Sequence, residues 1–306
     1  MFPNFPSTCK WVVFAAALLG LACLFGPAPE QVAAQGGPQR YIVQLRPQAG
    51  DSGQAAASLG RRYGFQARRV YHHALRGFAA TMTPQAAANL GRHPSVLRLE
   101  ADQVVHIVGK NGKGGKGGGG GGKPKPSQPP QVTPTGVSRI GGSADPDVNV
   151  NIAIIDTGSG PHVDLNVVGG VNFSTGRPNK YADRNGHGSH VAGTAAAINN
   201  AFGVVGVAPG APLWSVRVLD KNGSGFTSDV IAGVDWVAAR AEAIKVANMS
   251  LGGARNSLLD QAVQNAVAAG VVIVVAAGNS SEDVSLESPA GEPSAITVSA
   301  LADNDG

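Results

Sequence analysis

Cysteine is scarce in this chain, with only Cys9 and Cys23 among 306 residues. This excludes a small scaffold held together by disulfides and a cysteine-rich zinc site. Aromatic residues make up only 5% of the chain and charged residues 14%. Hydrophobic residues reach 43%, which excludes a wholly disordered chain. The length predicts about two domains with buried cores.

The formal net charge of +4 hides an uneven distribution. Residues 1–138 carry 15 Lys/Arg and four Asp/Glu, whereas residues 139–306 carry nine Lys/Arg and 16 Asp/Glu. A basic front half is compatible with binding to nucleic acid or to a membrane surface. It is equally compatible with two parts of one chain that attract each other.

The N-terminus has the pattern of a secretory signal peptide over residues 1–34. Lys10 precedes an uncharged apolar run over residues 11–26, and Val32-Ala33-Ala34 offers small residues for cleavage near Ala34. The run is short for a transmembrane helix, so an uncleaved anchor is the alternative interpretation. Cys23 follows only a weak lipoprotein pattern. We therefore expect a secreted, thiol-free mature chain with no stable membrane association.

Residues 40–108 are expected to form a small α+β domain of the split βαβ type. Thr83 and Pro84 suit the start of a helix, and Gly64 suits the end of another. The predicted strands are 41–45, 70–72, 77–82 and 96–107, and the predicted helices are 55–63 and 84–90.

Residues 109–131 are predicted to be a linker, because a Gly/Lys stretch is followed by a Pro-rich one and neither can form a core. A nucleic-acid-binding tail is the alternative. No aromatic residue is interleaved there to stack on bases, so we expect no nucleic-acid partner.

Residues 139–306 alternate between strands and helices, which predicts an α/β domain with a mostly parallel sheet and helices on both faces. The apolar run 150–155 is typical of a strand buried on both sides. Ser228 is a plausible helix cap. The other predicted strands are 213–219, 246–249, 271–276 and 295–300, and the predicted helices are 189–197, 228–241 and 258–269.

Three polar clusters follow strands or open helices in this part, where α/β folds place their sites. Asp156 ends the buried strand, His187 lies between two glycines at a helix start, and Asn279 follows another apolar strand. Each has a plain alternative: Asp156 and Asn279 also suit turns beside glycine. His187 and His190 could be metal ligands one helical turn apart, but a third ligand is lacking, and His190 is expected to be packed.

Taken together, Asp156-Thr157-Gly158, Asn185-Gly186-His187-Gly188-Ser189-His190, Ser250-Leu251-Gly252-Gly253 and Ala276-Ala277-Gly278-Asn279 resemble the subtilisin-like serine protease family (peptidase S8). These segments occur in the order of the family and cover nearly all of residues 139–306. The resemblance implies a subtilisin-like fold and a serine endopeptidase that hydrolyses peptide or protein substrates.

Roles follow by resemblance. Asp156 is the acid that orients the imidazole, His187 is the general base and then acid, and Asn279 is the oxyanion donor. The strand that pairs with substrate and the pocket for the residue before the scissile bond are Ser250, Leu251, Gly252, Ala276, Ala277 and Gly278. Residues 40–108 resemble the family's ferredoxin-like, inhibitor I9-type propeptide, a chaperone and inhibitor whose last strand would lie in the active-site cleft. Cleavage is expected after residues 106–108 or within the linker.

The resemblance also implies a structural calcium ion and no catalytic cofactor. Asp164 lies in a His-x-Asp-Leu segment, and a later Asn-rich loop resembles the family's calcium loop. Oxygen-only ligation suits calcium. The implied ligands are side-chain oxygens of Asp164 and Asn200 and carbonyls of Ile198, Phe202 and Val204. An Asx-rich surface turn is the alternative.

The serine nucleophile of the family is not found in this sequence. It is expected in a Gly-Thr-Ser-Met-Ala segment beyond Gly306, so the sequence is interpreted as C-terminally incomplete and the 306-residue chain as inactive. Two other hypotheses remain. One is a catalytically dead, peptide-binding remnant that captures extended peptides by strand pairing. The other is a nucleotide-binding α/β protein, although no phosphate-loop lysine pattern occurs.

Overall fold

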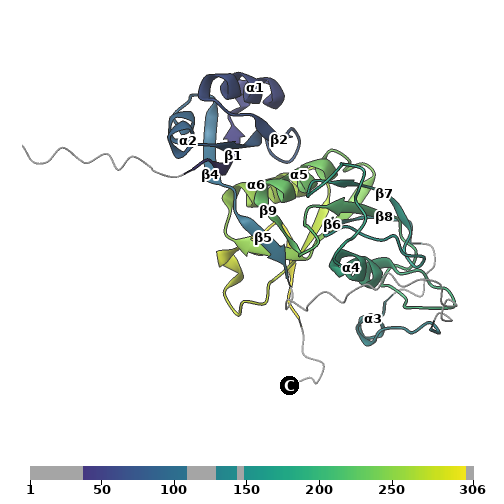
Figure 1. Ribbon diagram of the computed structural model, residues 1–306. Coiled ribbons are helices and arrows are strands. Elements are labelled where there is room, and N and C mark those ends of the chain that lie inside the picture. The colour runs from purple at the N-terminus through teal and green to yellow at the C-terminus, as the bar shows by residue number, and fades with distance from the viewer. Residues whose placement is uncertain (1–36, 109–128, 143–147, 301–306) are drawn as a thin grey trace, which may run out of the picture. The chain divides into compact units, whose positions relative to one another are not determined.

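The computed structural model describes residues 37–108, 129–142 and 148–300 (Figure 1). The predicted signal peptide, most of the predicted linker and the end of the chain from residue 301 lie outside the described residues. Among the described residues, no helix is both long enough and apolar enough to cross a membrane.

The N-terminal region is a four-stranded antiparallel sheet with two helices, as the sequence predicts. Its strand order is β2-β3-β1-β4, with β1 paired to both β3 and β4. The elements are β1 (Gln39–Leu45), the 3-10 turn η1 (Pro47–Ala49), α1 (Ser52–Tyr63), β2 (Ala67–Tyr71), β3 (Gly77–Met82), α2 (Pro84–Gly91) and β4 (Val96–Ala101).

Both helices begin and end where local chemistry favours it. The Asp51 carboxylate accepts a hydrogen bond from the Gln54 amide and starts α1 three residues before the predicted position. Gly64 ends that helix in the left-handed conformation, with a φ of 75°. Thr83 caps α2 through the Ala86 amide at 3.2 Å.

The single strand predicted over 96–107 is wrong. The structure has two strands, β4 and β5 (Val104–Ile107), separated by Asp102 and Gln103. β4 stays in the N-terminal sheet, whereas β5 leaves it and pairs with β9 (Ser224–Phe226) and β11 (Leu251–Ala254). Periodicity could not show this break, because both strands are apolar and extended.

The C-terminal region is built on a six-stranded parallel sheet of order β14-β12-β10-β6-β8-β7. Its strands are β6 (Asn151–Asp156), β7 (Val167–Asn172), β8 (Leu213–Arg217), β10 (Ile244–Met249), β12 (Val272–Ala276) and β14 (Ile296–Val298). The helices are α3 (Thr135–Arg139), α4 (His187–Ala196), α5 (Thr227–Ala238) and α6 (Ser257–Ala268), with a 3-10 turn η2 (Val284–Leu286) and β13 (Glu287–Ser288).

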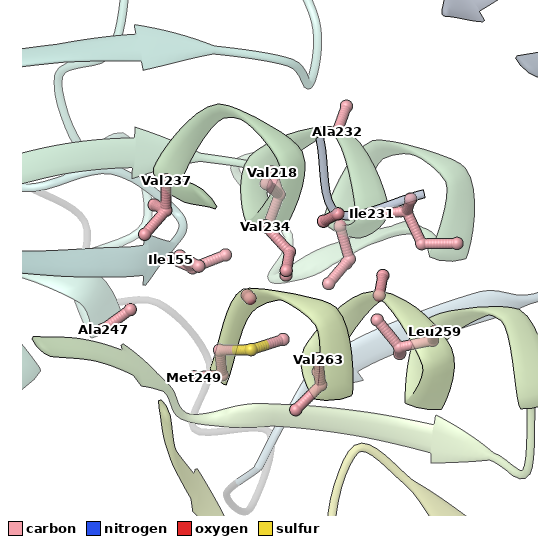
Figure 2. Close-up of a cluster of buried hydrophobic side chains, with 14 of the residues drawn as sticks. Ile155, Val218, Ile231, Ala232, Val234, Val237, Ala247, Met249, Leu259 and Val263 are labelled. Atoms are coloured by element: carbon pink, nitrogen blue, oxygen red, sulfur yellow. The ribbon is translucent and has the colours of Figure 1, made fainter. Parts of the chain in front are cut away.

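Helices cover both faces of this sheet, and neighbouring residues of β6 show how (Figure 1). Ile155 packs against α5 and α6, in a core that includes Val234 and Val263 (Figure 2). Ile154 points to the other face and packs against Ala192 and Ala196 of α4. The apolar run of β6 is therefore buried on both sides, as predicted.

The N-terminal sheet also has two buried faces. Val43 and Phe78 pack in a core under α1 and α2, while Ile42, Tyr71 and Leu75 belong to the core around α5 and α6. The Tyr71 hydroxyl donates to the carbonyl of Ser228 at 2.9 Å. The region up to β5 therefore packs directly on the two helices of the parallel-sheet domain.

The prediction that Ser228 caps α5 is wrong. The N-cap residue is Phe226, which provides no side-chain cap. Instead, the Asp102 carboxylate from the N-terminal region accepts from the Ser228 amide at 2.8 Å. A carboxylate at a helix N-terminus satisfies a free amide and is favoured by the helix dipole.

Candidate active site

Asp156 is the last residue of the central strand β6 and is fully buried. Its Oδ1 accepts from the Thr157 amide at 2.6 Å. Its backbone carbonyl accepts from the amides of Val218 and Leu219. A buried carboxylate held this firmly is stabilised only if a partner compensates its charge.

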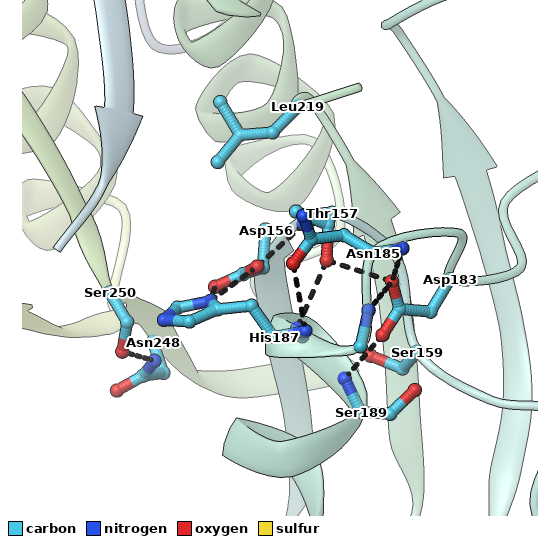
Figure 3. Close-up of polar contacts among 12 residues, drawn as sticks. Asp156, Thr157, Ser159, Asp183, Asn185, His187, Ser189, Leu219, Asn248 and Ser250 are labelled. Atoms are coloured by element: carbon cyan, nitrogen blue, oxygen red, sulfur yellow. Dashed lines mark hydrogen bonds and ion pairs between the residues drawn. The ribbon is translucent and has the colours of Figure 1, made fainter. Parts of the chain in front are cut away.

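That partner is His187, the first residue of α4. Its Nδ1 lies 2.9 Å from both carboxylate oxygens of Asp156 (Figure 3). The next residue must be glycine, because a Cβ on Gly188 would lie 2.0 Å from the carbonyl oxygen of Gly158. Tight contact between the start of α4 and the turn after β6 thus brings the imidazole onto the carboxylate.

The hydrogen bond with Asp156 raises the pKa of His187 above its ordinary value, although burial acts in the opposite direction. A hydrogen bond to the backbone of Val108 adds to the rise. Since Nδ1 faces Asp156, the Val108 contact lies on the Nε2 side. The ring therefore bridges a buried anion and the end of the β5 segment.

Asp183 is a site residue that the sequence interpretation missed. It accepts from the Thr157 hydroxyl at 2.9 Å and from the amides of Asn185, Gly186 and Ser189 at 2.8–3.0 Å. Burial raises its pKa, but these hydrogen bonds outweigh burial and lower the pKa below its ordinary value. The sequence signal for Asp183 is an acid four residues before His187, near a helix start whose amides need an acceptor.

β5 lies as an extended strand between β9 and β11, in antiparallel register with both. His106 pairs with Gly252 on one side and Ser224 on the other. The register continues past the strand, since the Val108 amide donates to the carbonyl of Ser250 at 3.1 Å. Residues 106–108 of this chain thus form an extended segment paired with residues 250–252.

The other predicted site residues gather around Val108. One cavity of about 390 Å³ is lined by Val108, Ser250, Ala276, Ala277, Gly278 and Asn279, among others. A second, of about 500 Å³, is lined by Val108, Gly252, Gly278, Asn279 and Glu287, among others. Ser250 Oγ accepts from the Asn248 side chain at 2.9 Å, which engages that hydroxyl away from the imidazole (Figure 3).

The predicted calcium ligands also converge. Asp164 is 3% exposed, and its Oδ1 accepts from the Asn200 amide group at 2.7 Å. Gln131, which the sequence interpretation missed, places its Nε2 2.9 Å from the carbonyl oxygen of Ile198 and 3.4 Å from that of Val204. The Phe202 amide donates to Asn200 Oδ1 at 2.9 Å.

His190 is exposed, so the expectation that it is packed is wrong. It lines a cavity of about 440 Å³ together with His162. Among the described residues, no group of three or more His, Cys, Asp or Glu side chains is placed to hold a metal ion. An imidazole on the outer side of α4 is exposed because that side faces away from the sheet.

This geometry defines a class of protein, the enzymes that move a proton with an imidazole oriented by a carboxylate. A buried carboxylate orients an imidazole whose second nitrogen faces the end of an extended peptide, and an amide side chain lines the same cavities. Such an arrangement can take a proton from a nucleophile and return it to a leaving group.

The family model of the subtilase family matches residues 147–306, and that of peptidase inhibitor I9 matches residues 40–108. The chain belongs to the subtilase family of serine peptidases and carries an I9 propeptide domain. It is 39% identical over 233 residues to Subtilisin E of Bacillus subtilis (strain 168), covering 73% of this chain and 55% of the relative. It is 43% identical over 180 residues to Subtilisin Savinase of Lederbergia lenta, covering 57% and 65%. The match thus spans 55% of the length of the first relative and 65% of the second.

Proposed function

We propose that this chain is part of a secreted serine endopeptidase that is made as a zymogen and inhibited by its own residues 40–108. Asp156 orients His187 and stabilises the imidazolium, His187 moves the proton, and Asn279 donates to the developing oxyanion. The proposed nucleophile is a serine in the continuation beyond Gly306. The proposed organisation is a signal peptide at 1–34, a propeptide domain at 40–108, a linker at 109–131 and the catalytic domain from 139.

One observation carries this proposal: the backbone of Val108 contacts His187 while β5 is paired between β9 and β11. This is the position of a product whose last residue is Val108. We therefore propose that the first self-cleavage falls after Val108, within the expected range of 106–108.

Charge supports the same assignment. Arg40 and Arg69 of the propeptide domain meet the acidic helix α5 at Asp229, with Arg69 Nε 2.8 Å from its carboxylate. Arg40 Nε also lies 2.6 Å from Asp102. The basic front half thus has an acidic partner within the chain, which favours cis docking over nucleic acid.

The calcium proposal passes a test of donor chemistry. Among the described residues Asp164 forms no ion pair, although it is buried; its carboxylate accepts from the side-chain amide of Asn200 and the backbone amide of Val204. Asp164, the carbonyls of residues 198, 202 and 204, and the side chains of Asn200 and Gln131 with their amides reversed would hold the ion. The ion would supply charge neutralisation and tie segment 129–132 to the loop 198–204. Chelation is expected to lower the Tm of the wild type more than that of Asp164→Asn.

The activity test compares this 306-residue chain with the protein extended through its natural C-terminus. We expect the extended protein to hydrolyse a peptide anilide and the 306-residue chain to be inert. His187→Ala should lower kcat/KM by more than about 10⁴-fold, whereas Ser250→Ala should retain a measurable rate.

Two results would contradict the proposal. If Ser250→Ala abolished activity in the extended protein, the nucleophile would be misassigned. If the extended protein bound peptides without cleaving them, the peptide-binding alternative would replace the endopeptidase.

A further inference from the structure

The larger cavity beside Val108 has an acidic floor. Glu287 opens β13, which pairs with the peptide-binding strand β11 through Ala254. Its Oε1 accepts from the Ser280 hydroxyl at 2.8 Å, which fixes the orientation of the carboxylate. The second oxygen, Oε2, lies 2.7 Å from the position that a Cβ would occupy on Gly278 and 3.8 Å from that position on Gly252.

Because Gly278 and Gly252 have no side chains, the Glu287 carboxylate can lie between the walls of the cavity. Gly278 has a φ of 96° and no room for a Cβ beside Oε2. Gly252 also borders Val108, whose Cγ2 lies 3.9 Å from the same Cβ position. Val108 Cγ2 and Glu287 Oε2 are therefore no more than 7.7 Å apart, since both lie within these distances of one point.

No cation neutralises this carboxylate in the part of the chain that the structure describes. Glu287 forms no ion pair there, and the nearby Arg255 is held by Asp260 at 2.9 Å and by the carbonyl of Ser285. Glu282 lines the same cavity and adds negative charge, while His106 lines it from β5. Val108 is too short and too apolar to satisfy Oε2.

We propose that Glu287 determines specificity, and that the pocket it closes accepts a lysine or arginine side chain of the residue before the scissile bond. This inference rests on the proposed endopeptidase function. Beyond Cγ, a lysine adds three bonds that span about 4 Å. Its ammonium group would therefore come within ion-pair distance of Oε2 from the position of Val108, and a half-buried charge pair would form.

The first test measures kcat/KM of the extended protein on two peptide anilides that differ only in Lys or Phe before the scissile bond. The wild type should prefer Lys. Glu287→Gln should lower the value for Lys by about 10- to 100-fold and that for Phe by less than about threefold. Glu282→Gln, which removes the same charge from an exposed position, should lower the Lys value far less because water screens it.

The second test needs no catalysis and uses the 306-residue chain. Val108→Lys places a lysine on the seated strand. Glu287→Gln should then increase the unfolding equilibrium constant about tenfold more in the Val108→Lys background than in the wild type.

The outcomes separate the two proposals. A wild type that cleaves the Phe substrate as well as the Lys substrate, an equal loss on both substrates in Glu287→Gln, or zero coupling with Val108→Lys overturns the role of Glu287. If no substrate is cleaved but the coupling is present, the endopeptidase proposal fails and the recognition of basic side chains by Glu287 stands.

Discussion

Asp235 on α5 joins the I9 domain to the parallel-sheet domain through an unusual set of contacts. Asp235 is 8% exposed, and its carboxylate accepts from the amides of His72, His73 and Ala74 at 2.7–3.2 Å, with Leu75 at 3.5 Å. These amides belong to the loop between β2 and β3. We predict that Asp235→Ala weakens the docking of this loop and destabilises the chain.

The magnitude follows from the burial of each donor. The Ala74 amide belongs to a fully buried residue and would lose its acceptor, which costs about 1–3 kcal/mol. His72 and His73 are exposed, so water replaces the carboxylate and each loss costs about 0.5–1.5 kcal/mol. The expected decrease in the free energy of unfolding is therefore about 2–6 kcal/mol. Asp235→Asn keeps one acceptor oxygen and should cost less.

Urea unfolding followed by the fluorescence of the adjacent Trp236 measures this change. Hydrogen exchange should also accelerate at the amides of residues 72–75. Glu242→Gln is the control, because that side chain is fully exposed and should change stability by less than about 0.5 kcal/mol. If Asp235→Ala were no less stable than this control, the reasoning from the buried amide would be refuted.

Three further predictions concern the active-site region. Asp156→Asn should lower the pKa of His187 in an NMR titration. Because that pKa is raised in the folded chain, the pair stabilises the fold fully at pH values below the ordinary imidazole pKa. The stability lost in Asp156→Asn should therefore shrink as the pH rises through the raised pKa. Asp183→Asn should lower the free energy of unfolding by about 1–2 kcal/mol near neutral pH. The pKa of Asp183 is lowered in the folded chain, so this difference should vanish as the pH falls through the lowered pKa. A difference that did not depend on pH would contradict the assignment. Gly188→Ala should lower the free energy of unfolding by more than about 2 kcal/mol, since the new Cβ would meet the Gly158 carbonyl; an unchanged Tm would show that the turn can move.

Much of the fold could be predicted because its signals are local. The buried strand ending at Asp156, the cap at Thr83 and the stop at Gly64 were all correctly identified from neighbouring residues. Two of the wrong predictions involved partners far away in sequence. Ser228 looks like a cap, but the acceptor comes from Asp102, and the break between β4 and β5 depends on strands that lie more than a hundred residues later.

The candidate site divides in the same way. The sequence by itself determined the family and nominated Asp156, His187 and Asn279, because each is a polar residue within two positions of a glycine at a strand end or helix start. Only the tertiary structure brought Asp156 onto His187, seated Val108 beside them and placed Glu287 against Gly278 and Gly252. Motifs depend on covalent neighbours, which a sequence records. Charge pairing and pocket shape depend on which backbones approach closely after packing, and that is decided by the whole fold.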